Sequence, residues 1–348
     1  KKYMTEAIEA SPEKPILIDK FLEDAIEVDV DSVCDGEEAV ICGFMEHIEQ
    51  AGIHSGDSAC VIPAYSLNPA IIKRIEELTI KTALELGVVG LMNIQFAVKN
   101  DDVYFLEVNP RGSRTIPFVS KATGIPWAKV ASLIMVGYKL KQFNLERKPT
   151  GMTCVKEVVL PFNKFPGVDT RLGPEMRSTV EVMGICNSFG VAYFKSQMAA
   201  NSSLPLSGRV FVSFSDKTKP KLMDAVRRMR DMGYQIVATR GTRNYLLEHG
   251  IDSEFIHKAH DGSPDILDLI QEGNIDLIFN TPAGAESRTD EIAMHKKTIQ
   301  FKVPYLSTVP GIRASVNGLE QAKRQNLTVH ALQDILGYTC NTMPKLLK

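Results

Sequence analysis

The sequence contains no closely spaced cysteine pair and no long apolar run. Its six cysteines stand far apart, at positions 34, 42, 60, 154, 186 and 340. Zinc and redox sites are usually marked by cysteines a few residues apart, so neither kind of site is predicted. Scattered thiols are typical of a reducing compartment, which predicts a cytoplasmic protein. No stretch approaches the roughly 18 consecutive apolar residues of a transmembrane helix, so no membrane partner is expected.

The sequence also lacks an excess of charge of either sign. Lys and Arg number 40 against 42 Asp and Glu, which gives a formal net charge of -2. This balance excludes nucleic-acid binding that relies on bulk positive charge. With 44% hydrophobic and 24% charged residues among 348, the composition predicts a globular chain of about two or three domains. The chain begins at Lys1 without an initiator methionine or a signal-like stretch, so we expect it to be part of a longer protein.

The pattern of elements changes near Ser207. Before it, runs rich in valine and isoleucine predict strands at 16–18, 27–34, 39–46 and 59–62. After it, strands are predicted at 210–214, 234–238, 254–256, 275–279 and 305–306. Helices are predicted between and after them, at 219–232, 242–249, 264–272, 290–301 and 312–325. Such alternation with short links predicts a doubly wound α/β domain with a parallel sheet.

A helix and a hairpin follow the first strands. The helix is predicted over 68–87, because Asn68 can cap it and Pro69 suits its first turn. Strands at 92–98 and 103–108 flank a short polar turn, which predicts a β-hairpin. The remaining first part is predicted as a helix over 126–141 and then mixed, Pro- and Gly-rich sequence to about residue 206.

The predicted hairpin carries the strongest chemical signal. Residues two apart on a strand share a face, so Glu107 and Asn109 point the same way, and pairing can bring Gln95 beside them. A carboxylate with two amide oxygens suits Mg²⁺ or Mn²⁺ that keeps nucleotide phosphates among its ligands. Arg111 and Arg114 follow and supply positive charge for a phosphoryl group. Spacing alone leaves open an exposed polar strand face with two surface arginines.

A second concentration of acidic residues, histidines and glycines lies between 46 and 58. It is typical of a binding loop, although the sequence alone leaves open a solvated turn.

Six segments, taken in order, resemble the large subunit of the carbamoyl-phosphate synthase family. They are 21–36, 45–59, 90–100, 107–124, 156–169 and 172–184. They are similar to its second ATP-grasp unit, the half that phosphorylates carbamate with the second ATP after carboxyphosphate and ammonia have formed it. The resemblance implies phosphoryl transfer by positioning and charge neutralisation, without a protein nucleophile. The product would be carbamoyl phosphate for arginine and pyrimidine synthesis.

The resemblance also implies roles for single residues. It places Mg²⁺ or Mn²⁺ at Gln95, Glu107 and Asn109, and a catalytic group of Glu107, Arg111 and Arg114 beside them. The implied ATP pocket consists of Asp19, Leu22, Glu27, Ile53, His54, Ser55, Gln95 and Glu107. A K⁺ site is implied at Glu27, His47, Glu49, Gln50 and Ser58.

From about residue 207 the chain resembles the regulatory domain that ends this subunit and shares its fold with methylglyoxal synthase. The implied site for UMP or IMP consists of Lys219, Thr239, Gly241, Thr242, Lys258, Asn280 and Thr281. Segments 239–242 and 280–284 each follow a predicted strand, where doubly wound sheets bind anions, although 239–242 by itself also suits a helix cap. Arg240 and Arg243 replace small residues of that synthase, so no catalysis by this domain is expected. Ornithine is implied between the domains at Glu49, Asp57, Glu157, Tyr305 and Ser307, where Ser307 replaces a threonine.

The expected fold is therefore α/β and α+β, a partial ATP-grasp domain followed by a doubly wound parallel-sheet domain. The predicted boundaries are 1–145 for the C-terminal part of the ATP-grasp unit, 146–206 for a connecting region packed on it, and 207–348 for the allosteric domain. No Gly-rich lid loop precedes Gln95, so we expect the chain to start inside the unit and, as a separate chain, to bind ATP weakly and be inactive. The implied partners are the rest of the large subunit, the glutaminase small subunit and the effectors, in an oligomeric holoenzyme.

Two other interpretations share parts of this pattern. A different ATP-grasp ligase, such as a carboxylase of the biotin type, would share Glu107 and Asn109 but would not explain the second domain. A nucleotide-sensing module without catalysis would have the same ancestry and differ only in activity.

Overall fold

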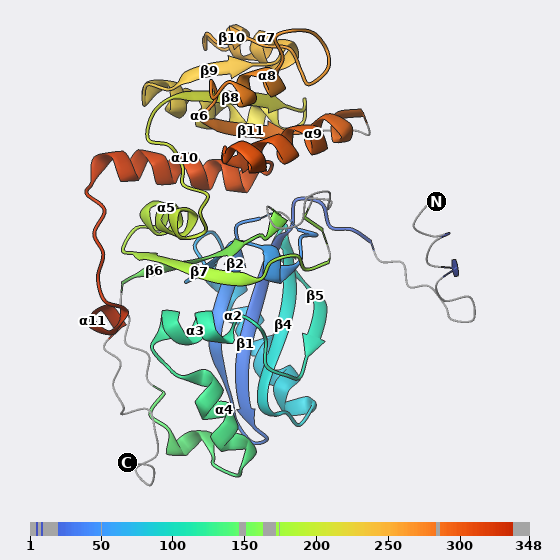
Figure 1. Ribbon diagram of the computed structural model, residues 1–348. Helices are drawn as coiled ribbons and strands as arrows, with labels where there is room; N and C mark the ends of the chain where they lie inside the picture. Colours follow the sequence, from blue (N-terminus) through green and yellow to red (C-terminus); the bar gives the residue numbers. More distant parts are fainter. Residues whose placement is uncertain are drawn as a thin grey trace.

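The computed structural model describes residues 5, 8–9, 20–49, 51–145, 151–162, 172–173, 175–282 and 286–336 of the chain. Within these residues the chain forms two sheets. Helices α5 (Phe189–Ala199) and α10 (Val309–Arg324) lie between them (Figure 1).

The first sheet is antiparallel throughout and has seven strands in the order β5-β4-β1-β2-β3-β6-β7. The strands are β1 (Ile26–Asp35), β2 (Ala39–His47), β3 (Cys60–Ile62), β4 (Val89–Lys99), β5 (Asp102–Asn109), β6 (Thr153–Val159) and β7 (Val180–Cys186). The predicted hairpin is confirmed as β4 and β5.

Helices cover both faces of this sheet. Helix α2 (Pro69–Glu85) buries Ile71 and Ile75 on one face, and the Asn68 side chain caps it by accepting from the Ala70 N–H at 3.0 Å, as predicted. Helices α3 (Ile116–Thr123) and α4 (Trp127–Met135) cover the other face.

The predicted helix over 126–141 is wrong in its length. Helix α4 ends at Met135, because Gly137 adopts a left-handed φ of 103° that no helix can continue, and only a short 3₁₀ turn, η2 (Leu140–Gln142), follows. Helix α3, which was not predicted, has its own signals in Pro117 at its start and Gly124 with a φ of 73° at its end.

Three regular elements lie in the part predicted as mixed sequence. Strands β6 and β7 extend the first sheet beyond β3, and α5 packs on them. Strand β6 is buried on both faces despite carrying Lys156 and Glu157, so it shows no alternation of apolar and polar residues.

The second sheet is parallel throughout, as the sequence predicts, and its five strands lie in the order β10-β9-β8-β11-β12. The strands are β8 (Arg209–Phe214), β9 (Gln235–Ala238), β10 (Glu254–Phe255), β11 (Leu277–Thr281) and β12 (Tyr305–Leu306). The crossover helices are α6 (Lys219–Asp231), α7 (Arg240–Glu248), α8 (Ile266–Gln271) and α9 (Glu286–Phe301). The strand order reverses between β8 and β11, which is where such sheets bind ligands.

The two sheets share one apolar core. A single cluster joins Val61 and Val155 of the first sheet, Tyr193 of α5, Val316 of α10 and Val210 of the second sheet. After α10 the chain returns to the first sheet, where helix α11 (Leu332–Leu336) packs on α3 (Figure 1).

Candidate functional site

The hairpin brings the three predicted metal ligands together. Gln95 on β4 lies directly opposite Glu107 on β5, and the adjacent pair on the same face is Asn93 and Asn109. A β-bulge after Gln95 pairs Phe96 with Phe105 and leaves Leu106 as the extra residue. The polar pairs therefore face α3, while Phe96 is buried against α2.

The donor set is chemically suited to a hard cation. Gln95 Nε2 donates to Ser55 Oγ at 2.7 Å, and Asn109 Nδ2 donates to Glu107 Oε1 at 2.8 Å. Both amide nitrogens are thus used within the protein. The amide oxygens and the second Glu107 oxygen are left to bind a ligand, and oxygen donors of this kind suit Mg²⁺ or Mn²⁺.

A small cavity of about 110 Å³ joins these ligands to the two predicted arginines. Its lining residues are Asp29, His54, Ser55, Gly56, Asn93, Gln95, Glu107, Asn109, Arg111, Ser113, Arg114 and Thr115. Arg114 contacts the Met176 sulfur, and Arg111 donates to the Gly112 carbonyl at 3.2 Å. Among the described residues neither arginine forms an ion pair, so both charges are available to an anion.

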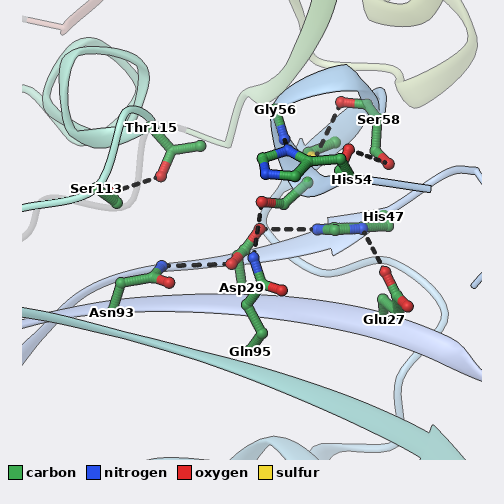
Figure 2. Close-up of polar contacts among 12 residues, drawn as sticks. Glu27, Asp29, His47, His54, Gly56, Ser58, Asn93, Gln95, Ser113 and Thr115 are labelled. Carbon is green, nitrogen blue, oxygen red and sulfur yellow. Dashed lines mark hydrogen bonds and ion pairs between the residues drawn. The ribbon is translucent and has the colours of Figure 1, made fainter. Parts of the chain in front are cut away.

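A buried polar network lies beneath this cavity (Figure 2). Asp29 Oδ2 bonds His47 Nε2 at 2.9 Å, and the other His47 nitrogen lies 3.4 Å from Glu27 Oε2. Asn93 Nδ2 donates to Oδ1 of Asp29 at 3.3 Å (Figure 2). It also donates to Oδ1 of Asp31 at 3.0 Å. Sequence reasoning missed Asp29, Asp31 and Asn93. The only signal was the alternation of valine and aspartate on β1.

Burial controls the protonation of this network. It raises the pKa of the Asp31 carboxyl to about 6, and the neighbouring Asp29 carboxylate adds to the rise, while hydrogen bonds from Ser113, Asn93 and Thr115 oppose it. Burial alone would lower the pKa of His47, but its contacts with Cys60, Asp29 and Glu27 raise it well above its ordinary value. The imidazolium form of His47 thus compensates the buried carboxylate of Asp29.

The predicted ATP and K⁺ residues lie around the loop between β2 and β3. Glu27 Oε1 accepts from the Gly52 N–H at 3.0 Å, which fixes the loop before Ile53. His54 Nδ1 accepts from the Gly56 N–H at 2.9 Å, and Ser58 Oγ donates to the His54 carbonyl at 3.3 Å (Figure 2). Leu22 lies in the turn before β1. Asp19 and Gln50, predicted for ATP and K⁺, lie outside the described residues.

The residues predicted to bind ornithine form hydrogen bonds with different partners in the structure. Buried Asp57 accepts the backbone N–H groups of Arg177 and Ser178, both at 2.7 Å. Glu49 Oε2 accepts from Thr308 Oγ1 at 3.0 Å across the domain interface, next to Ser307.

Glu157 and Tyr305 lie on opposite sides of that interface. Glu157 accepts from Gln197, and burial raises its pKa to about 7, with the nearby Glu49 carboxylate adding to the rise. The Tyr305 hydroxyl accepts from Asn280 Nδ2 at 2.8 Å instead.

A second cavity, of about 340 Å³, lies at the carboxyl ends of the parallel strands. Every residue predicted for the nucleotide effector lines it, namely Lys219, Thr239, Gly241, Thr242, Lys258, Asn280 and Thr281. Lys219 Nζ lies 2.6 Å from Asp216 Oδ1, and Thr242 Oγ1 accepts from the Phe214 N–H at 3.0 Å. Asp216 and Asp290 also line this cavity and were not predicted.

Two negative findings apply to the described part of the chain. It holds no cluster of three His, Cys, Asp or Glu side chains arranged for a metal, so the hairpin set depends on its amide oxygens. No helix in the described ranges is long and apolar enough to cross a membrane.

Two protein families match separate parts of the chain. Residues 1–143 match the family described as carbamoyl-phosphate synthase L chain, ATP binding domain, and residues 221–307 match the MGS-like domain family. The chain thus joins a part with an antiparallel sheet, similar to the ATP-binding domain of that family, to a part with a parallel sheet, similar to the MGS-like domain family, which confirms the expected fold class.

Full-length relatives carry one common description. The chain is 52% identical to the carbamoyl phosphate synthase large chain of Archaeoglobus fulgidus over 335 residues, 96% of this chain and 31% of that one. It is 51% identical to the large chain of Nostoc sp. over 341 residues, again 96% of this chain and 31% of the relative. A biotin carboxylase domain of a single-chain bacterial carboxylase superposes with a TM-score of 0.43 at 16% identity, covering 58% of this chain and 57% of that domain. The chain is therefore similar over nearly its whole length to carbamoyl phosphate synthase large chains, and it spans about 31% of the length of these two relatives.

Proposed function

We propose that this chain is the part of a carbamoyl phosphate synthase large chain that phosphorylates carbamate with ATP. The observation that supports the proposal is the placement of Gln95, Glu107 and Asn109 on one strand face, in one cavity with Arg111 and Arg114. Oxygen ligands and fixed guanidinium charges are what phosphoryl transfer requires. A carbamate oxygen forms a bond to the γ-phosphorus while the bond from that phosphorus to the β–γ bridging oxygen breaks, so ADP leaves and no proton is transferred.

Mg²⁺ or Mn²⁺ fits this proposal as the cofactor beside ATP. Gln95, Glu107 and Asn109 would hold it, because the two amide nitrogens are used as donors within the protein, which leaves both amide oxygens and the second Glu107 oxygen for the ion. When bound, the ion neutralises phosphate charge. Arg111 and Arg114 orient the phosphoryl group and stabilise its charge, and Glu27 accepts from ribose hydroxyls near Gly52.

The proposal is tested on the large chain that contains this segment, through ATP formation from carbamoyl phosphate and ADP, the reverse of the proposed step. Arg114→Met is expected to lower this rate by about 100-fold, because it removes one fixed charge from the phosphoryl group. Bicarbonate-dependent ATP hydrolysis, which we assign to the other ATP-grasp unit of the large chain, is expected to continue. Arg74→Met, on the exposed face of α2, is the matched control. Unchanged ATP formation by Arg114→Met would contradict the proposal.

We also propose that the second cavity binds a nucleotide effector through its phosphate. Lys219, Lys258 and the N-terminus of α7 supply positive charge, and Thr239, Thr242 and Thr281 supply hydroxyl groups. UMP and IMP are the expected effectors.

Binding of UMP or IMP to the large chain is measurable by calorimetry in phosphate-free buffer. Lys219→Met is expected to weaken it by about 10-fold or more, because a charge-assisted hydrogen bond is lost. Lys217→Met, an exposed neighbour that does not line the cavity, is expected to bind as the wild type does. The absence of heat with either nucleotide would rule out this effector site.

Further ligands and partners complete the proposal. Burial raises the pKa values of two carboxyl groups, those of Glu49 and Glu157. A cationic effector such as ornithine between them would favour their ionised forms and so offset the cost of removing these carboxylates from water. K⁺ would bind beside Glu27, Glu49 and the loop near His47 and Ser58. The same assignment implies three further features: the remainder of the large chain, a glutaminase small subunit, and an oligomeric holoenzyme in the cytoplasm. The described cysteines support this compartment, because they are thiols rather than disulfides.

A further inference from the structure

Asp31 is a buried carboxylate directly beneath the arginine-bearing loop. It lies on β1, an interior strand of the first sheet between β4 and β2, and only 1% of it is exposed to solvent. Its Oδ2 accepts from Thr115 Oγ1 at 2.8 Å, and its Oδ1 accepts from Asn93 Nδ2 at 3.0 Å. The two oxygens therefore accept from different side chains, and both of these side chains line the cavity of the candidate active site.

The contact with Thr115 fixes the loop on both sides of Arg114. Thr115 is itself buried and immediately precedes α3. Its hydroxyl also lies 2.8 Å from Ser113 Oγ (Figure 2). The residues before and after Arg114 are thus tied to one point on β1.

The two arginines have few anchors of their own. Both are exposed, and the Arg111 side chain bonds only the carbonyl of its neighbour Gly112. Among the described residues neither guanidinium is paired with a carboxylate. Apart from the contact of Arg114 with the Met176 sulfur, their direction is therefore set by the backbone of the loop, and the loop is held by Asp31 through Thr115.

Burying a carboxylate at this position costs free energy. Burying an ionised group costs several kcal/mol unless hydrogen bonds satisfy it, and an apolar residue would pack without that cost. Asparagine would not keep both contacts as they are, because its single side-chain oxygen would accept from one of the two groups and its amide nitrogen would meet the other, so either the Asn93 amide loses its acceptor or the Thr115 hydroxyl must turn to accept.

We propose that Asp31 is a positioning residue for phosphoryl transfer. It orients the Asn93 amide and, through Thr115, the loop that carries Arg111 and Arg114. This inference rests on the proposed function of the cavity and adds the residue that holds its geometry. A displacement of the charged groups by about 1 Å is enough to slow such a step by about 100-fold.

The test uses the large chain and the ATP-forming reverse reaction. Asp31→Asn is expected to lower kcat by about 100-fold, while the KM for ADP changes by less than about threefold, because the nucleotide loop at Gly52 is held by Glu27 instead. Thr115→Val is expected to give the same split, and Thr115→Ser, which keeps the hydroxyl, to restore kcat to within about threefold of wild type. The double variant Asp31→Asn with Thr115→Val is expected to be no slower than either single variant, because both remove one contact.

Ser32→Ala is the matched control. Ser32 is the next residue on β1, is fully buried, and donates to the Met92 carbonyl at 3.2 Å on the opposite face of the sheet. Its removal is expected to leave kcat within about twofold of wild type.

The inference would be overturned if Asp31→Asn had a kcat close to that of Ser32→Ala. It would also be overturned if Asp31→Asn raised the KM for ADP and left kcat unchanged. If Asp31→Asn does not fold, equal kcat values for Thr115→Val and Thr115→Ser would overturn it as well. An inactive Arg114→Met beside a fully active Asp31→Asn removes only this inference, whereas an active Arg114→Met removes the proposed function itself.

Discussion

Glu107→Gln in the large chain is expected to abolish carbamate phosphorylation, with kcat lowered by about 1,000-fold or more. The substitution is nearly isosteric, and the remaining side-chain oxygen can still accept from Asn109 Nδ2, as Glu107 Oε1 does at 2.8 Å. What is lost is the single negative charge among the three oxygen ligands of the hairpin. A divalent cation would then be held by neutral amide oxygens alone, which bind hard cations weakly.

The measurement is carbamoyl phosphate formation over a titration with Mg²⁺ and with Mn²⁺. Excess metal is not expected to restore the rate, because the charge on the phosphates is then no longer neutralised at a fixed position. Glu77→Gln, on the exposed face of α2, serves as the control for loss of one carboxylate. Turnover by Glu107→Gln at the wild-type rate would remove Glu107 from the metal site, and effector binding by the second domain is expected to be the same in both variants.

Gly184→Ala is expected to destabilise the protein by about 3 kcal/mol. Gly184 lies on β7 directly under α5, where an added Cβ would collide with the Ala192 carbonyl oxygen and lie 2.6 Å from the Ser196 nitrogen. Both are backbone atoms of α5, so no side-chain rotation relieves the collision and the helix must move. The other side of α5 is also closely packed, because a Cβ added to Gly190 would lie 2.9 Å from the Asn317 carbonyl oxygen of α10.

Thermal unfolding measures this effect, with an expected drop in the midpoint of about 5 °C or more. Gly173→Ala is the matched control, because no atom lies within 4 Å of a Cβ added there. Equal midpoints for the two variants would show that α5 can move away from β7 at little cost.

The sequence predicts the second domain better than the first for a topological reason. Each parallel strand is followed by its own helix, so every element can be recognised from local signals. The first sheet depends on distant pairing instead: β3 ends at Ile62 and pairs with β6, which begins at Thr153. No local sequence pattern predicts that pairing. Lys156 and Glu157 are buried, but charged residues of this kind in a sequence indicate a surface segment.

The candidate site shows the same division. Glu107 and Asn109 could be predicted because residues two apart share a strand face, and the hairpin turn gave the partner strand of Gln95. Asp29 and Asp31 could not, because alternation of valine and aspartate is also the pattern of a strand with one face in water. The structure places that face under α3, where the aspartates serve the cavity instead of the solvent.

The apolar cluster that continues from Val61 through Tyr193 and Val316 to Val210 limits how the two sheets can influence each other. A hinge between them would have to open this cluster to water, at about 25 cal/mol for each Å² of apolar surface. A swinging motion of one sheet against the other is therefore disfavoured. Coupling between the two cavities must therefore be transmitted by small displacements of close-packed side chains and of helices α5 and α10, which lie between the sheets.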